Sequence, residues 1–449
     1  MGGSGMTVRR LEVCRKNGTD GRNGQYAQRV TRRRRFDCSG AVRSAFVLYI
    51  ALGLTALESP VSAQTSLADL LGREAAPEGQ PKALLEEVFL YGYLENSYVV
   101  NLRHASPHNV NDLRFYDHDA DYSWNALELS FKKGPSERYP WGFGVVTTAG
   151  MDSQKNHSLG IFRDLDDGAP YYRNTAKYDL VEAYGSVLLP LGEGLTVKAG
   201  KWGTLIGYEV YESPKNLNFS RDFLYTLGTP YTHTGLLVTY PFAKWLSTTL
   251  GFTNGWDNSD NPNGYLKAIG QVAFTPSDKF SITTNFHVGP EQLRSQMIGR
   301  VNQRWVVDTT VLYTGIDKLT LAVAFDFAGE ENDPVLVALG TRKHNNSSWS
   351  GIAGYAAYDW TKSLRTALRV EYFADPQGVR NGITAPGHNG DYYDITPTLE
   401  YKIWRGLIGR LEYRHDQASR RSFSLDHFST TPTSRAQDTF SVALSYLFF

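Results

Sequence analysis

A repeated alternation of apolar and polar side chains, in units closed by turn residues, constrains the fold more than any other feature. A period of two places alternate side chains on opposite faces of a β-strand. In 318–328, for example, Val323 and Phe325 fall on the face opposite to Asp326. The pattern predicts sixteen strands: 88–102, 122–133, 141–150, 176–188, 193–202, 231–240, 245–255, 265–274, 279–289, 303–315, 318–328, 348–360, 363–373, 391–402, 405–416 and 437–449.

The length of these units separates them from the strands of soluble proteins. Strands of soluble sheets typically have about 5 to 6 residues, whereas a tilted strand that crosses a bilayer needs about 9 to 11. The units match the second value. No apolar run reaches the ~18 residues that a membrane-spanning helix requires, so the sequence excludes a helical membrane protein.

The connections between the units alternate in length along the chain. After even-numbered units they are short: 134–140, 189–192, 241–244, 275–278, 316–317, 361–362 and 403–404. After odd-numbered units they are long and polar: 103–121, 151–175, 203–230, 256–264, 290–302, 329–347, 374–390 and 417–436. Outer-membrane barrels have short periplasmic turns and long external loops. We therefore expect an all-β fold, a closed antiparallel transmembrane β-barrel of about sixteen strands over 88–449.

The first 63 residues differ from the rest in charge. Arg32 to Arg35 and Arg43 precede an apolar stretch at 45–57, and small residues follow up to Ala63. This is the order of a secretory signal. We predict an export signal with an extended basic region over 1–63, cleaved near Ala63, and a periplasmic lead-in over 64–87.

Removal of that signal changes the overall charge. It takes eleven of the 46 basic residues and four of the 46 acidic residues. The remaining 35 basic and 42 acidic residues give a formal charge of −7. A nucleic-acid binder is disfavoured because the basic footprint for phosphate is missing. Cys14 and Cys38 leave with the signal, so disulfides, thiolate metal sites and cysteine nucleophiles are excluded.

Several short stretches of the mature chain occur together in one known family. The chain resembles, over nearly its whole length, the OmpL-like family of outer-membrane β-barrel porins. The resemblance implies a porin. The matching stretches are 92–98 (GYLENSY), 201–204 (KWGT), 207–209 (GYE), 216–221 (NLNFSR), 230–235 (PYTHTG), 254–257 (NGWD), 369–372 (RVEY) and 410–414 (RLEYR).

The third long connection, 203–230, is the candidate constriction of the pore. In large porins the third external loop commonly folds into the barrel, and opposite charges there screen solutes by size and charge. A surface loop with solvated charges is the alternative. The candidate residues are Glu209, Glu212, Lys215, Arg221 and Asp222.

Strands thirteen to fifteen have charged residues at every second position. Arg or Lys on the lipid face would cost about 2 to 4 kcal/mol at mid-membrane, so we expect these side chains to line the inner wall. Ion pairing across strands and contact with solute are both compatible with this position. The residues are Arg365, Arg369, Glu371, Glu400, Lys402, Arg410, Glu412 and Arg414.

Catalytic and metal-binding patterns are weak. Acidic groups at 164–167 and 117–119 could be read as cation sites, but solvated acidic turns are the stronger interpretation. No phosphate loop, nucleophile elbow or His-Glu-x-x-His helix occurs. We expect no enzyme activity, no cofactor and no bound metal.

These observations predict an outer-membrane porin of a Gram-negative bacterium that passes small hydrophilic solutes by diffusion. The expected partners are outer-membrane lipid, those solutes and the assembly machinery that reads a C-terminal strand such as 437–449; a homo-oligomer is left open. A barrel-embedded hydrolase and a closed barrel acting in surface adhesion are the alternatives. A soluble secreted all-β protein is disfavoured by the loop alternation.

Overall fold

The computed structural model describes residues 65–71, 84–102, 121–161, 177–297, 301–334, 336, 346–380, 390–423 and 433–448. The predicted export signal, its cleavage site and the acidic groups at 117–119 and 164–167 lie outside these residues. Within the described ranges, no helix is long and apolar enough to cross a membrane.

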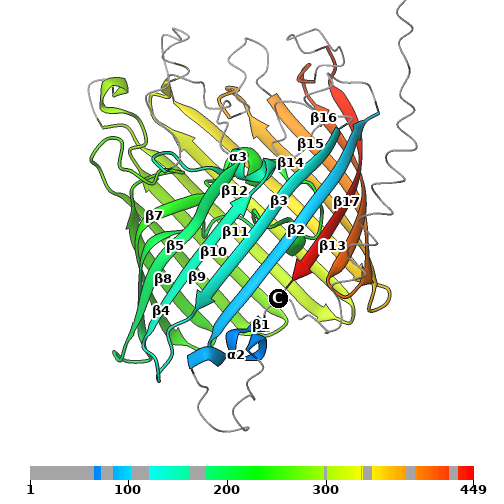
Figure 1. Ribbon diagram of the computed structural model, residues 1–449. Helices are drawn as coiled ribbons and strands as arrows, with labels where there is room; N and C mark the ends of the chain where they lie inside the picture. Colours follow the sequence, from blue (N-terminus) through cyan, green and yellow to red (C-terminus); the bar gives the residue numbers. More distant parts are fainter. Residues whose placement is uncertain are drawn as a thin grey trace, which may run out of the picture. The chain divides into compact units, whose positions relative to one another are not determined.

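Sixteen long strands form one antiparallel sheet that closes on itself (Figure 1). Each strand pairs with the next in sequence, and the last pairs with the first, so that Ala443 lies opposite Ser97. All sixteen predicted strands are confirmed, with ends shifted by a few residues. They are β2 (Val88–Asn101), β3 (Asp121–Lys133), β4 (Trp141–Ala149), β5 (Tyr178–Leu189), β6 (Leu195–Gly203), β7 (Thr232–Ala243), β8 (Leu246–Thr253), β9 (Lys267–Ser277), β10 (Phe280–Gly289), β11 (Arg304–Ile316), β12 (Leu319–Glu330), β13 (Ser347–Asp359), β14 (Leu364–Asp375), β15 (Gly390–Trp404), β16 (Leu407–Ala418) and β17 (Ala436–Phe448).

Closure explains why the backbone can lie in hydrocarbon. A closed sheet has no unpaired edge, so every strand finds hydrogen-bond partners on both sides. Long and short connections alternate along the whole chain of strands. The connection 204–231 is a long one at one end of the barrel, and 405–406 is a short one at the opposite end. The predicted closed barrel and its loop alternation are therefore confirmed.

The two faces of the sheet differ in polarity. In β12, Val323 and Phe325 are exposed at 43% and 45%, whereas Asp326, the residue after Phe325, is fully buried. In β15, Ile395 is exposed and Asp394 is buried. Apolar side chains thus cover the outer face and polar ones the inner face, which is the polarity that a lipid-embedded barrel requires.

Short elements lie between the strands. Near the start of the described chain, β1 (Thr65–Ser66) pairs antiparallel with the first residues of β2, so that Thr65 lies opposite Leu90. The remaining elements are α2 (Leu67–Leu70), η1 (Leu84–Glu86), α3 (Met151–Asn156), η2 (Ser213–Lys215), η3 (Leu224–Gly228) and η4 (Arg294–Gln296).

Candidate functional site

The connection between β6 and β7, which we call the inner loop (residues 204–231), packs against the inner face of the barrel. Its apolar side chains Phe223 and Leu224 are buried in one cluster with Ala353, Phe373 and Tyr392, which point inward from β13, β14 and β15. The predicted candidate loop, 203–230, matches this segment. The contacts fix one side of the loop to one sector of the wall.

Two glutamates of the wall hold the loop backbone. The Glu412 carboxylate accepts hydrogen bonds from the amide N–H groups of Phe219 at 2.6 Å and Ser220 at 2.9 Å. Glu371 accepts from Phe223 at 2.8 Å and Leu224 at 2.7 Å. Amides at the start of a helical turn lack partners within it, so Glu371 supplies acceptors for the first turn of η3. Charged acceptors make such bonds about twice as strong as neutral ones.

Arginines of the wall hold the loop carbonyls. Arg410 donates to the carbonyl oxygen of Ser213 at 2.8 Å and of Asn216 at 2.9 Å. Arg414 donates to the carbonyl of Arg221 at 2.6 Å. The planar guanidinium group presents several donors in a fixed fork, so one side chain can bind two turns of backbone.

Arg369 joins the loop and the wall through charge. Its guanidinium contacts the Glu209 carboxylate of the inner loop at 2.9 Å and the Asp394 carboxylate of β15 at 2.9 Å. Asp394 also lies 2.6 Å from Arg414. All four side chains are almost completely buried. Buried charges need such paired partners, because an unpaired one would be strongly destabilising.

Asp222 and Arg221 shape the loop from within. The Asp222 carboxylate accepts a hydrogen bond from the amide of Tyr225 at 2.6 Å and one from the Tyr355 hydroxyl. Arg221 donates to the carbonyls of Phe219 and Tyr211. Both charged residues therefore bind the loop to itself and to β13 and do not project freely into water.

The loop approaches the wall closely at Gly228. A Cβ atom there would lie 3.1 Å from an oxygen of Asp326 and 3.4 Å from the Phe373 ring. The Trp349 indole donates to the Gly228 carbonyl at 2.9 Å. A side chain at this position would have to push the Asp326 carboxylate aside by a few tenths of an ångström, so the end of η3 lies tightly against β12 and β13.

The ionisation of two loop carboxyls is shifted by their surroundings. Burial raises the pKa of Glu209 to about 8; the nearby Asp222 adds to this and Arg369 opposes it. Burial also raises the pKa of Asp222, against the opposing effect of Arg369 and of the Tyr355 hydrogen bond. Transfer of a carboxylate out of water penalises its charged form.

The predicted wall residues divide into two groups. The first group is covered by the inner loop, and each member contacts the loop backbone or its Glu209 carboxylate. Its three arginines also pair with Asp394 or Glu400 of β15. This group is Arg369, Glu371, Arg410, Glu412 and Arg414. The other three lie further along the strands: Arg365 pairs with Asp359 at 2.8 Å, Glu400 pairs with Arg410 at 2.7 Å, and Lys402 is exposed near the end of β15.

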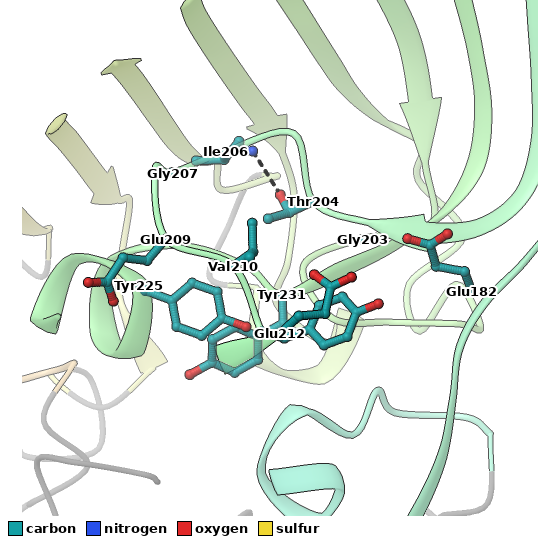
Figure 2. Close-up of a pocket in the computed structure, with 11 residues that line it drawn as sticks. Glu182, Gly203, Thr204, Ile206, Gly207, Glu209, Val210, Glu212, Tyr225 and Tyr231 are labelled. Atoms are coloured by element: carbon teal, nitrogen blue, oxygen red, sulfur yellow. Dashed lines mark hydrogen bonds between the residues drawn. The ribbon is translucent and has the colours of Figure 1, made fainter. Parts of the chain in front are cut away.

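On its other side, the inner loop borders a small cavity of about 130 Å³ (Figure 2). Glu182 enters this cavity from β5, and Figure 2 shows it across the space from Glu209. Glu212 also lines it. Most of the remaining wall comes from the loop itself: Gly203, Thr204, Ile206, Gly207, Val210, Tyr211, Tyr225 and Tyr231.

A second cavity has a volume of about 700 Å³ and shares one lining residue with the first. Tyr231 lines both. The larger cavity is bordered by α3, by the inner loop and by the connections after β8, β10 and β14, and its charged residues have both signs: Lys155, Arg304, Arg380, Asp257, Asp260 and Glu291.

Two important residues were not among the predicted site residues. Asp394 bridges Arg369 and Arg414, and Glu182 forms the β5 side of the small cavity. In 391–402, Asp394 falls on the same face as Glu400, which was predicted to line the inner wall. The alternation therefore also predicts an inward position for Asp394. Among the described residues, no group of three or more His, Cys, Asp or Glu is arranged to hold a metal ion.

Comparison with known proteins identifies the family. The family described as "Putative beta-barrel porin-2, OmpL-like" matches residues 88–448. The chain belongs to this family. The resemblance noted in the sequence is thereby confirmed, and membership in a porin family implies an outer-membrane location. None of the curated protein sequences compared with the chain matches it.

The chain is similar to several solved structures at low sequence identity. The outer membrane channel DcaP of Acinetobacter baumannii has a TM-score of 0.51 and 10% identity, over 80% of this chain and 97% of DcaP. An anion-selective porin from Comamonas acidovorans has a TM-score of 0.49 and 10% identity, over 80% and 99%. Salmonella typhi OmpF in complex with daunomycin has a TM-score of 0.49 and 14% identity, over 80% and 97%. The DcaP match supports the fold.

Proposed function

We propose that the protein is an outer-membrane porin that passes small hydrophilic solutes by diffusion through a water-filled barrel narrowed by the inner loop. The observation that supports this most is the asymmetric position of the loop. One side is bound to β14 and β16 through Glu371, Arg369 and Glu412, while the other side borders a cavity that reaches β5.

This arrangement suits a permanent constriction. A loop bound at several points by charged hydrogen bonds keeps its shape, and a polar cavity beside it keeps water. Pore diameter and the charges that line it then decide which solutes pass. In this proposal the larger cavity is an external vestibule and the smaller one lies on the route inward, since both share Tyr231.

The location and partners follow from the same proposal. Residues 1–63 direct export and are removed near Ala63, residues 64–87 stay in the periplasm, and 88–449 form the barrel. Strand β17 is read by the outer-membrane assembly machinery, and lipid covers the apolar face. The protein acts without a cofactor and catalyses no reaction; a homo-oligomer is compatible with this function.

Liposome swelling tests this proposal. Protein purified from outer membranes is reconstituted into liposomes, which are then diluted into isosmotic solutions of neutral sugars of increasing mass. We expect swelling to be fast for the smallest sugars and to fall steeply with mass. Liposomes that contain correctly folded barrel and do not swell in any sugar would reject diffusion through it.

A further inference from the structure

We propose that the small cavity between the inner loop and β5 is a binding subsite for small organic ammonium ions. This inference rests on the proposed porin function and specifies one class of solute that the constriction recognises. Three features support it: the charges of the lining residues, the positions of their counter-ions, and the aromatic rings around the space.

The charged groups that line the cavity all have the same sign. Glu182, Glu209 and Glu212 contribute three carboxyl groups, and no Lys, Arg or His is among the lining residues. Figure 2 shows Glu182 and Glu209 on opposite sides, with Glu212 between them. A cleft lined by charge of one sign, in low-dielectric surroundings, concentrates counter-ions.

The basic partners of these carboxylates stand outside the lining. Lys132 lies 2.7 Å from Glu182, Lys215 lies 2.5 Å from Glu212, and Arg369 lies 2.9 Å from Glu209. None of the three lines the cavity. A solute in the cavity therefore meets Glu182 and Glu212 without a basic residue in the lining. Both oxygens of Glu209 are already bound, one by Arg369 and one by the amide of Asp222.

Three tyrosines line the same space. The Tyr225 and Tyr231 rings lie 4.9 Å apart between centroids and are tilted against each other. The third, Tyr211, is 8% exposed, and among the described residues its buried hydroxyl has no hydrogen-bond partner. A phenolic oxygen can accept a hydrogen bond from an ammonium group.

Carboxylates combined with aromatic faces favour an organic cation over a metal ion. Ring faces attract cations, and quaternary ammonium ligands are recognised by cages of aromatic rings. A metal ion would need several oxygen ligands converging at short distance, and no such group of His, Cys, Asp or Glu occurs among the described residues. The larger cavity lacks this preference because its charges have both signs.

Block of single-channel current tests the subsite. The protein as purified from outer membranes is inserted into planar bilayers in KCl at pH 8.5, and tetramethylammonium or propylammonium is added. We expect a saturable reduction of K⁺ current. Glu182→Gln combined with Glu212→Gln should weaken the block by about tenfold, and Tyr211→Phe should weaken block by propylammonium more than by tetramethylammonium, which has no N–H to donate.

Glu193→Gln is the matched control, because Glu193 is exposed in the turn between β5 and β6 and does not line the cavity. It should leave the block unchanged. The shift of heat-dependent mobility on gels shows that each variant is folded. An open channel that shows no saturable block, or a double variant with unchanged block, overturns the subsite while the porin function stands.

If no current is seen, conduction is rejected, and saturation-transfer NMR with tetramethylammonium tests the subsite separately. Transfer in the wild-type protein that disappears in the double variant would support the subsite. The absence of transfer in the wild-type protein would overturn the subsite as well.

Discussion

Arg369 of β14 and Glu209 of the inner loop form an ion pair of 2.9 Å across 160 residues of sequence, and both side chains are almost fully buried. The same guanidinium also binds Asp394 of β15. One arginine thereby links two strands and the loop. This contact is one of those that hold the proposed constriction against the wall.

Loss of the Arg369 charge should loosen the loop. Arg369→Met keeps an unbranched side chain but removes the guanidinium group, which leaves Glu209 and Asp394 buried with less compensation, at a cost of about 3 to 5 kcal/mol for a broken buried pair. We expect a lower unfolding temperature in detergent and a larger, noisier single-channel conductance. Lys402→Met, at an exposed position, is the control. Equal stability and conductance in Arg369→Met would show that the pair does not position the loop.

Removal of the Glu412 carboxylate should expose the loop segment that it holds. Glu412→Ala removes the acceptor for two loop amides, and hydrogen bonds to charged groups contribute about 1.5 to 3 kcal/mol each. A cysteine introduced as Leu217→Cys, at a half-buried position of the loop, should react with a maleimide faster in the Glu412→Ala background. The parent Leu217→Cys protein sets the reference rate. An unchanged rate would mean that the other contacts suffice.

Cation preference should increase with pH above neutrality. Because the pKa of Glu209 is raised to about 8, this carboxyl gains its charge above the range in which ordinary carboxyls ionise. The reversal potential in a KCl gradient should shift towards cations between pH 6 and 9. Glu209→Gln should remove part of this shift; an identical profile in the variant would assign the change to other groups.

The same raised pKa predicts a loss of stability at high pH. The folded state binds the Glu209 proton more tightly than the unfolded chain does, so this stabilisation is present at low pH and declines as the pH rises through about 8. Thermal unfolding at pH 6 and pH 9 should show a smaller difference in Glu209→Gln than in the wild-type protein.

The outer face should not tolerate charge. Val323 is 43% exposed in the middle of β12, and Val323→Arg should cost about 2 to 4 kcal/mol if that position meets hydrocarbon. Urea unfolding in lipid vesicles measures the change, with Val323→Leu as the control. A neutral effect of the arginine would place Val323 outside the bilayer.

The strands were predictable because lipid on one face and polar groups on the other enforce alternation. β12 shows this, since Phe325 and Asp326 occupy opposite faces. Even β4, in which Gly142 and Gly144 weaken the pattern, was located from the same alternation. The period-two charges of its strand predicted Glu371 as a wall residue, but its binding of the loop amides depends on the path of the loop.

Other parts of the site could not be read from the sequence. The pairing of Glu209 with Arg369 joins distant segments, and no local pattern encodes it. Glu182 points into the cavity after a register shift in the pairing of β4 with β5, between Val146 and Thr147. Such a bulge places an extra residue in one strand, so simple alternation through 178–182 does not give the direction of its side chain.

Single-channel recording from protein purified from outer membranes shows whether the barrel conducts. We expect discrete, ohmic conductance steps in KCl that become larger when Arg369→Met loosens the inner loop. A barrel that is folded by its gel mobility, inserts into the bilayer and gives no conductance in either form would contradict it.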